Sequence, residues 1–195
     1  MVLNVKINFE DVYNPDSISD DLRITGFTTE LEAGANRPLK VAISNEVHEL
    51  LPYTYNLAFG PLKADGKIDD KVELTHQDYS KVFSTILLSA FTYLKEHPDH
   101  FIGVDGSDNR RAYLYYKLLQ RNYDYLNKHF DIFGIKYYVR ISRPRKRQYD
   151  NPFNFHDIKP APVKIVKGKM LSHDEMYNYF TFRIKQSKVN SSLNS

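Results

Sequence analysis

The chain has 195 residues, of which 42% are hydrophobic and 26% charged, proportions typical of one folded globular unit. It contains no Cys, which excludes disulfide bridges, Cys-ligated zinc and a thiol nucleophile. Residues 1–100 carry 9 Lys and Arg against 16 Asp and Glu, whereas residues 101–195 carry 18 against 8. The resulting formal charges of −7 and +10 predict one surface that suits a polyanion.

The N-terminus and the apolar stretches predict a cytoplasmic protein. Residues 1–10 lack the basic flank and the apolar run of a signal peptide. The longest strongly apolar stretch, residues 86–91, is far too short to span a membrane. We therefore expect no membrane association, and no residue pattern calls for a cofactor.

Strands dominate the predicted first half of the chain. Residues 3–9 alternate apolar and polar side chains, which is the period of a half-buried strand. Turn residues separate the further strands that we expect over residues 23–31, 38–47 and 53–59. Asp65-Gly66 then predicts a hairpin turn, with residues 68–74 as the returning strand.

Two helices follow in the predicted order. Thr75 and Asp78 have the spacing of a capping box, and the apolar stripe that follows has helical period up to Leu94. His97-Pro98 ends this helix, because a proline disfavours the helical conformation in the residue before it. A second helix is expected over residues 110–130, with Asn122 on its inner stripe.

The rest of the chain predicts short strands and an irregular excursion. Strands are expected over residues 101–104, 135–141 and 177–185. Residues 143–169 are rich in proline and charge and predict an extended basic excursion with little regular structure, and residues 187–195 a disordered tail. The whole predicts an α+β fold: one domain over residues 1–186, with a mainly antiparallel sheet, two principal helices packed on it and one possible parallel pair of strands.

The turn into the second helix is a candidate anion site. Gly106 and Ser107 precede the helix, and Arg110 and Arg111 lie in its first turn. A strand-to-helix turn of this kind directs free backbone N–H groups and the positive end of the helix dipole at one point. Ser107 can equally serve as an ordinary helix cap, with nearby aspartates neutralising the arginines, so both interpretations stay open.

A dense basic run is the second candidate site. Five cations fall within eight residues: Arg140, Arg143, Arg145, Lys146 and Arg147. Tyr149 follows them two residues later. Lys117 and Arg121 add charge on the outer face of the second helix. Dense Lys and Arg gain affinity for RNA or DNA by releasing counterions, and tyrosines can stack on unpaired bases. One alternative is a solvated basic loop that docks on the acidic N-terminal half of the chain. Another is a surface that docks an acidic protein partner or self-associates with the acidic half of another copy.

The sequence contains no catalytic signature and no metal motif. Its seven His are scattered, without H-E-x-x-H or a comparable spacing. His97 and His100 lie close together, but two ligands do not make a metal site. A metal-independent nuclease that combines His, Arg and Tyr is the third alternative, although nothing in the sequence brings such a trio together. Oligomeric state is not predicted.

An ordered series of short motifs resembles a family of small uncharacterised bacterial proteins, mostly from Bacteroidota. The resemblance covers residues 53–141 and rests on four segments: YNLAFG at 55–60, IDD at 68–70, KVFST at 81–85, and GS, R and LY at 106–107, 111 and 114–115. The family has no established activity. Its small size and scattered occurrence imply accessory genes of toxin–antitoxin or defence type.

The chain departs from that family at three positions. Pro61 replaces an Asp, and Asp108 and Ala112 replace threonines beside the Gly-Ser turn. Losing both hydroxyls weakens the resemblance as support for an anion site.

Overall fold

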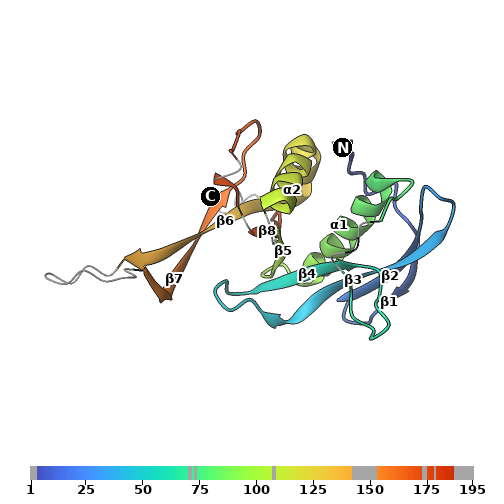
Figure 1. Cartoon of the computed structure of the whole chain (residues 1–195), viewed down its shortest axis with the longest axis horizontal. Helices are drawn as coiled ribbons and strands as arrows, with labels where there is room; N and C mark the ends of the chain where they lie inside the picture. The colour runs from blue at the N-terminus through green and yellow to red at the C-terminus, as the bar shows by residue number, and fades with distance from the viewer. Residues whose placement is uncertain are drawn as a thin grey trace, which may run out of the picture.

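A computed structural model describes residues 4–186 with the exception of 70, 71, 73, 107, 108, 142–152, 173, 174 and 178. Within these residues the fold is α+β, as the sequence predicts: three helices and an eight-stranded, mostly antiparallel sheet form one domain (Figure 1). The strands are β1 (Pro15–Ile18), β2 (Ile24–Glu30), β3 (Asn36–Val47), β4 (Thr54–Gly60), β5 (Phe101–Asp105), β6 (Phe130–Ile141), β7 (Phe153–Lys164) and β8 (Tyr179–Ile184). The helices are α1 (Tyr79–Glu96), α2 (Asn109–Arg121) and α3 (Tyr123–His129).

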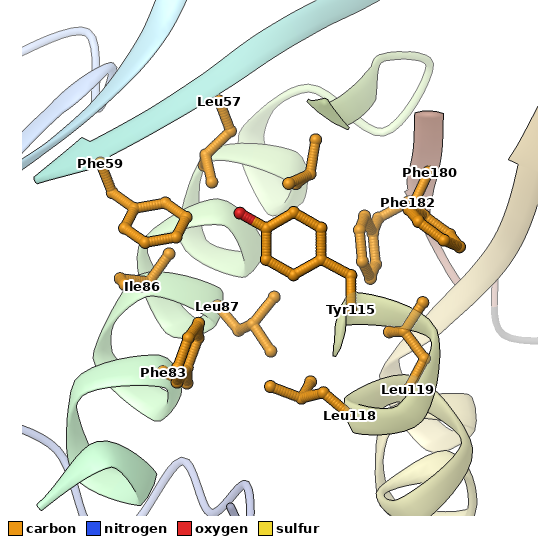
Figure 2. Close-up of a pocket in the computed structure, with 11 residues that line it drawn as sticks. Leu57, Phe59, Phe83, Ile86, Leu87, Tyr115, Leu118, Leu119, Phe180 and Phe182 are labelled. Atoms are coloured by element: carbon orange, nitrogen blue, oxygen red, sulfur yellow. The ribbon is translucent and has the colours of Figure 1, made fainter. Parts of the chain in front are cut away.

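The strand order is β1-β2-β3-β4-β5-β8-β6-β7. β4 and β5 form the parallel pair, because α1 crosses over between them. Side chains of α1 and α2 pack against side chains of β4 and β8 in one shared core layer. Both helices therefore cover the same face of the sheet (Figures 1 and 2).

The first helix forms where the sequence predicts it. Its inner stripe is buried, including Val82, Ile86 and Leu94, each at most 2% exposed. The helix begins one turn later than the capping-box spacing suggests: Asp78, not Thr75, is the N-cap, and its side chain accepts from the Lys81 backbone N–H at 2.9 Å.

Residues 68–74 do not form the predicted returning strand in their described part. The turn at Asp65-Gly66 is present, but it closes only an isolated bridge between Leu62 and Ile68. β4 already pairs with β3 on one side and with β5 on the other. No free edge of β4 is left for a returning strand.

The predicted N-terminal strand is also wrong, although its alternation is real. Val5 and Ile7 are each 2% exposed, yet residues 4–8 belong to no strand. The segment lies against the helices, where side chains satisfy its backbone groups. The alternation of apolar and polar residues in this segment therefore indicates which side chains are buried. It does not indicate that the segment belongs to the sheet.

The second helix is divided, and the proline-rich excursion contains a long strand. Asn122 separates α2 from α3, where the sequence predicts one helix. β7 occupies much of the excursion and pairs with β6 alone. An edge strand tolerates Pro160 and Pro162 because proline removes a donor that such a strand can leave unpaired. The predicted tail, residues 187–195, lies outside the described residues.

Candidate functional site

β6 and β7 form a hairpin that extends beyond the rest of the sheet. β8 pairs with β6 only over Phe130–Ile135. From Lys136 to Ile141, β6 pairs only with Phe153–Ala161 of β7 among the described residues. We call these two paired segments the ribbon. In Figure 1 the ribbon projects from the body at the left.

One face of the ribbon combines basic and aromatic side chains. Tyr138 is 58% exposed and lies directly opposite Lys159 on β7. Lys136 shares their face, because side chains alternate along a strand, and its ammonium group lies 5.7 Å from the centre of the Tyr177 ring. Lys136 and Lys159 are not among the site residues that the sequence predicts. In the sequence, the only sign of this basic face is the two-residue spacing of Lys136 and Tyr138, which places both on one face of a strand. Lys159 joins that face only because β7 is a strand paired with β6.

The predicted basic run falls at the end of this ribbon. Arg140 is in β6, opposite Asn154. Arg143, Arg145, Lys146, Arg147 and Tyr149 lie outside the described residues, in the connection from β6 to β7. Chain connectivity alone therefore assigns these residues to the segment that joins the two strands of the ribbon.

A second basic group follows the outer side of α2. Arg110, Lys117 and Arg121 are exposed, whereas Arg111 is half-buried. The Lys117 ammonium lies 5.2 Å from the centre of the Tyr113 ring, and Arg121 donates to the Asn4 side chain at 3.3 Å. The far end of the ribbon points away from α2 in Figure 1. The two groups are thus separate regions of the described surface.

Gly106 has a packing role at the start of α2. It is buried, and a β-carbon placed on it would lie 2.8 Å from the Ala112 Cα. Only glycine lets the end of β5 approach the helix this closely. Ser107 lies outside the described residues, so the structure gives no geometry for the predicted anion site beyond Gly106, Arg110 and Arg111.

The structure also assembles a His–Tyr–Arg cluster that the sequence could not locate. The Arg23 guanidinium lies 4.7 Å from the Tyr55 ring centre and 5.0 Å from that of Tyr93. The Tyr93 hydroxyl and His100 Nδ1 are 2.9 Å apart, and the His97 and His100 rings stack with centres 4.9 Å apart. Burial, the neighbouring His97 and then Arg23 lower the pKa of His100.

This cluster has the residue types of a metal-independent nuclease but not the arrangement. General acid–base cleavage needs the two imidazoles to face a phosphate from different sides. Here they stack on each other at an interplanar angle of 10°, which leaves no room for a phosphate between them. Among the described residues, no group of three or more His, Asp or Glu could hold a metal ion.

The interior holds a small apolar cavity between α1, α2 and the sheet (Figure 2). Its volume is about 40 Å³, so it has room for little more than one water molecule. Leu57, Ile86 and Phe180 are among its lining residues, and Tyr115 reaches into it from α2 (Figure 2). A space this small and apolar is a packing gap in the core.

The comparisons with known proteins give a family and no activity. A family model described as a family of unknown function (DUF6934) matches residues 31–155, and the chain belongs to this family. The match includes the region on which the resemblance to an uncharacterised family rests. No curated protein and no solved structure match the chain. None of the described helices is long and apolar enough to cross a membrane.

Proposed function

We propose that this member of the DUF6934 family binds RNA or DNA through the ribbon. The observation that carries the proposal is the shape and chemistry of the ribbon: two paired strands that leave the body with Lys136, Tyr138 and Lys159 on one face. A two-stranded ribbon fits the major groove of a duplex. Its tyrosine can alternatively stack on the bases of a single strand.

The charge of the connecting segment supports the same proposal. Arg143, Arg145, Lys146 and Arg147 follow Ile141 within a few residues, so they extend the basic character of the ribbon beyond its last pair. Contacts to phosphates supply affinity without base specificity. We therefore expect binding that depends on salt and only weakly on sequence.

The basic side of α2 provides a second contact region in this proposal. Arg110, Lys117 and Arg121 belong to α2, and the far end of the ribbon points away from this helix (Figure 1). A nucleic acid long enough to reach both regions should bind more tightly than a short one, because the second contact becomes intramolecular. In this proposal Gly106 and Arg111 belong to the second region, and Ser107 of the predicted anion site lies outside the described residues.

Reversing charge on the ribbon tests the proposal. We expect Lys136→Glu with Lys159→Glu to weaken binding of a fluorescently labelled oligonucleotide by at least about tenfold at low salt. Fluorescence anisotropy with a single strand and with a duplex measures the effect. The matched control is Lys95→Glu with Lys128→Glu, which changes the net charge equally on the helices. Equal losses in both variants would show that net charge, not the ribbon, determines binding.

Docking of an acidic protein partner is the second candidate, favoured by the division of charge along the chain. Its contacts would come from the same ribbon and connecting segment, so the two candidates differ in the ligand. If the protein binds no oligonucleotide at low salt but co-purifies with an acidic protein, the partner function replaces the first proposal. Loss of that complex on reversing charge at Arg143, Arg145 and Arg147, detected by light scattering, would then locate the interface.

A nuclease of toxin type is the third and weakest candidate. It would use His97 or His100 with Arg23, and the stacked rings argue against it. Degradation of RNA or DNA by the purified protein, abolished in His100→Ala, would establish it.

A further inference from the structure

The N-terminal segment is bound by side chains from two helices, in the manner of a peptide ligand. Four consecutive backbone N–H groups, those of Lys6, Ile7, Asn8 and Phe9, each donate to a side-chain oxygen. Their acceptors are Ser80, Asn122, Ser84 and Tyr125, in that order, at 2.8–3.0 Å. We call these four residues the segment site.

The partners alternate between the two helical elements. Lys6 and Asn8 donate to α1, while Ile7 and Phe9 donate to Asn122, the cap of α3, and to Tyr125 within it. Successive N–H groups of an extended chain point in opposite directions, so an extended segment between two helices presents its donors to both. The spacing also matches: Ser80 and Ser84 are about 6 Å apart along their helix, close to the roughly 6.8 Å that two extended residues span.

Asn122 recognises the backbone in both directions. Its amide oxygen accepts from the Ile7 N–H at 2.8 Å, and its amide nitrogen donates to the Val5 carbonyl at 3.1 Å. This buried side chain thus bonds the donor and the acceptor of an extended chain, as a neighbouring strand would. Its second donor bond, to the Leu118 carbonyl at 3.0 Å, holds the amide in place.

Apolar contacts add side-chain specificity to the backbone recognition. Val5 and Ile7 are each 2% exposed. Phe9 lies in a ring of aromatic side chains with centroid distances of 5.0–6.4 Å, formed by Phe91, Tyr125, His129 and Phe130. The site therefore accepts an extended peptide with apolar side chains at every second position.

We propose that the segment site is an exchangeable peptide-binding site, filled in cis by residues 4–9 and available to the same segment of a second copy of the chain. Among the described residues, the segment pairs with no strand of the sheet. Its release would therefore break no strand ladder of the described sheet. Local opening of this kind is one route by which segments exchange between copies of a protein.

A trans-binding experiment tests this proposal in the full chain. The probe is a fluorescent peptide with the sequence of residues 4–13, and the acceptor is the full-length Ile7→Asp variant, in which a buried charge expels the cis segment. We expect saturable binding at least tenfold tighter than binding to the wild-type chain, whose own segment competes. A peptide that carries Ile7→Asp should not bind.

A second substitution separates specific docking from adhesion to exposed apolar surface. Adding Asn122→Leu to the Ile7→Asp protein keeps the site apolar but removes its backbone recognition, and should weaken peptide binding at least tenfold. Unchanged binding in that double variant would overturn the proposal. So would the absence of binding to an Ile7→Asp protein whose circular dichroism matches the wild type.

A substitution that weakens the binding of the cis segment less severely provides the test if the Ile7→Asp protein does not fold. Phe9 is only half-buried, and Phe9→Ala removes its aromatic contacts while leaving Val5 and Ile7 in place. This variant should bind the peptide more tightly than the wild type by a measurable factor, about threefold or more on the scale of local opening. If a folded Phe9→Ala protein binds no more tightly than the wild type, the exchange does not occur.

Discussion

Gly103 shows how one missing side chain determines packing on the sheet face opposite the helices. The Tyr179 side chain lies over it, and a β-carbon at Gly103 would lie only 2.0 Å from the tyrosine hydroxyl oxygen. Burial, followed by Tyr137 and Asp105, raises the pKa of Tyr179 far above its ordinary value. Burial therefore favours the protonated form of this hydroxyl.

We expect Gly103→Ala to lower the free energy of unfolding by about 1–3 kcal/mol, the usual cost of overpacking. Urea denaturation followed by circular dichroism measures the change. Gly26→Ala is the matched control on an outer strand, because its β-carbon would meet mainly the movable Ser17 side chain. Equal losses of stability in the two variants would show that the contact with Tyr179 is not the cause of the destabilisation.

Three histidines make the fold sensitive to acid. Burial lowers the pKa of His76, His100 and His129 below the ordinary value of 6.5. The folded protein therefore favours their neutral forms, and the unfolded chain binds more protons in the pH range just below 6.5. The contribution of these neutral histidines to the free energy of unfolding is fully present above that pH. It is lost progressively as the pH falls below it.

The urea midpoint should accordingly be lower at about pH 5 than at about pH 7.5. His100→Asn should reduce this pH dependence, because the stacked His97 ring and Arg23 add to the effect of burial at His100. A midpoint that is equal or higher at the acidic pH would contradict this explanation.

At the level of elements, the break between α2 and α3 depends on Asn122. A continuous helix would be the default for this sequence, yet the side chain of Asn122 is only 6% exposed and bonds the backbone of residues 5 and 7 as well as the Leu118 carbonyl. In the sequence, the only sign of the role of Asn122 is that a polar residue lies on the otherwise apolar inner stripe of the predicted second helix. Nothing local specifies its partner, because that partner is more than 100 residues away.

Replacing Asn122 by Ala should destabilise the protein by about 1–3 kcal/mol, since the Ile7 N–H is left buried without an acceptor. Chemical denaturation measures the loss. Asn127→Ala in α3 is the control: its side-chain oxygen accepts from the exposed Lys185 ammonium at 3.3 Å, and its effect should stay within about 0.5 kcal/mol. A comparable loss in both variants would mean that the backbone bonds to Asn122 contribute little.

The sequence predicts elements well where period and pairing agree, as in β2, β3, β4 and α1. It fails where tertiary context decides. Residues 4–8 have the period of a strand but lie on helices, and β7 contains prolines that only an edge position allows. The ribbon could not be predicted for the same reason, because its basic face depends on the register of β6 with β7.

The candidate site was predictable only in part. Clustered charge identified Arg140 and the residues that follow it, and helical period placed Lys117 and Arg121 on an exposed face of α2. Lys159 needed a partner strand. The His–Tyr–Arg cluster combines Arg23, which directly precedes β2, with Tyr55 of β4 and with residues of α1 and of the turn that follows it. Only the folded chain brings these three segments together.

For the molecule as a whole, the division of charge now has a structural form. The acidic first half supplies the strands β1–β4 and all of α1, and the basic second half supplies α2 and the ribbon. Among the described candidate cations, Arg110, Lys117 and Arg121 lie on α2, and Lys136, Arg140 and Lys159 lie on the ribbon. We propose the ribbon as the main contact with a nucleic acid.

The salt dependence of binding tests this account most directly. Oligonucleotide affinity is measured over a series of salt concentrations for the wild type and for Lys136→Ala with Lys159→Ala. If the ribbon contacts phosphates, log affinity should fall linearly with log salt, and the variant's slope should be shallower by about one for each lysine removed. Identical slopes for the two proteins, or no binding by the wild type at low salt, would contradict the claim that the ribbon binds nucleic acid.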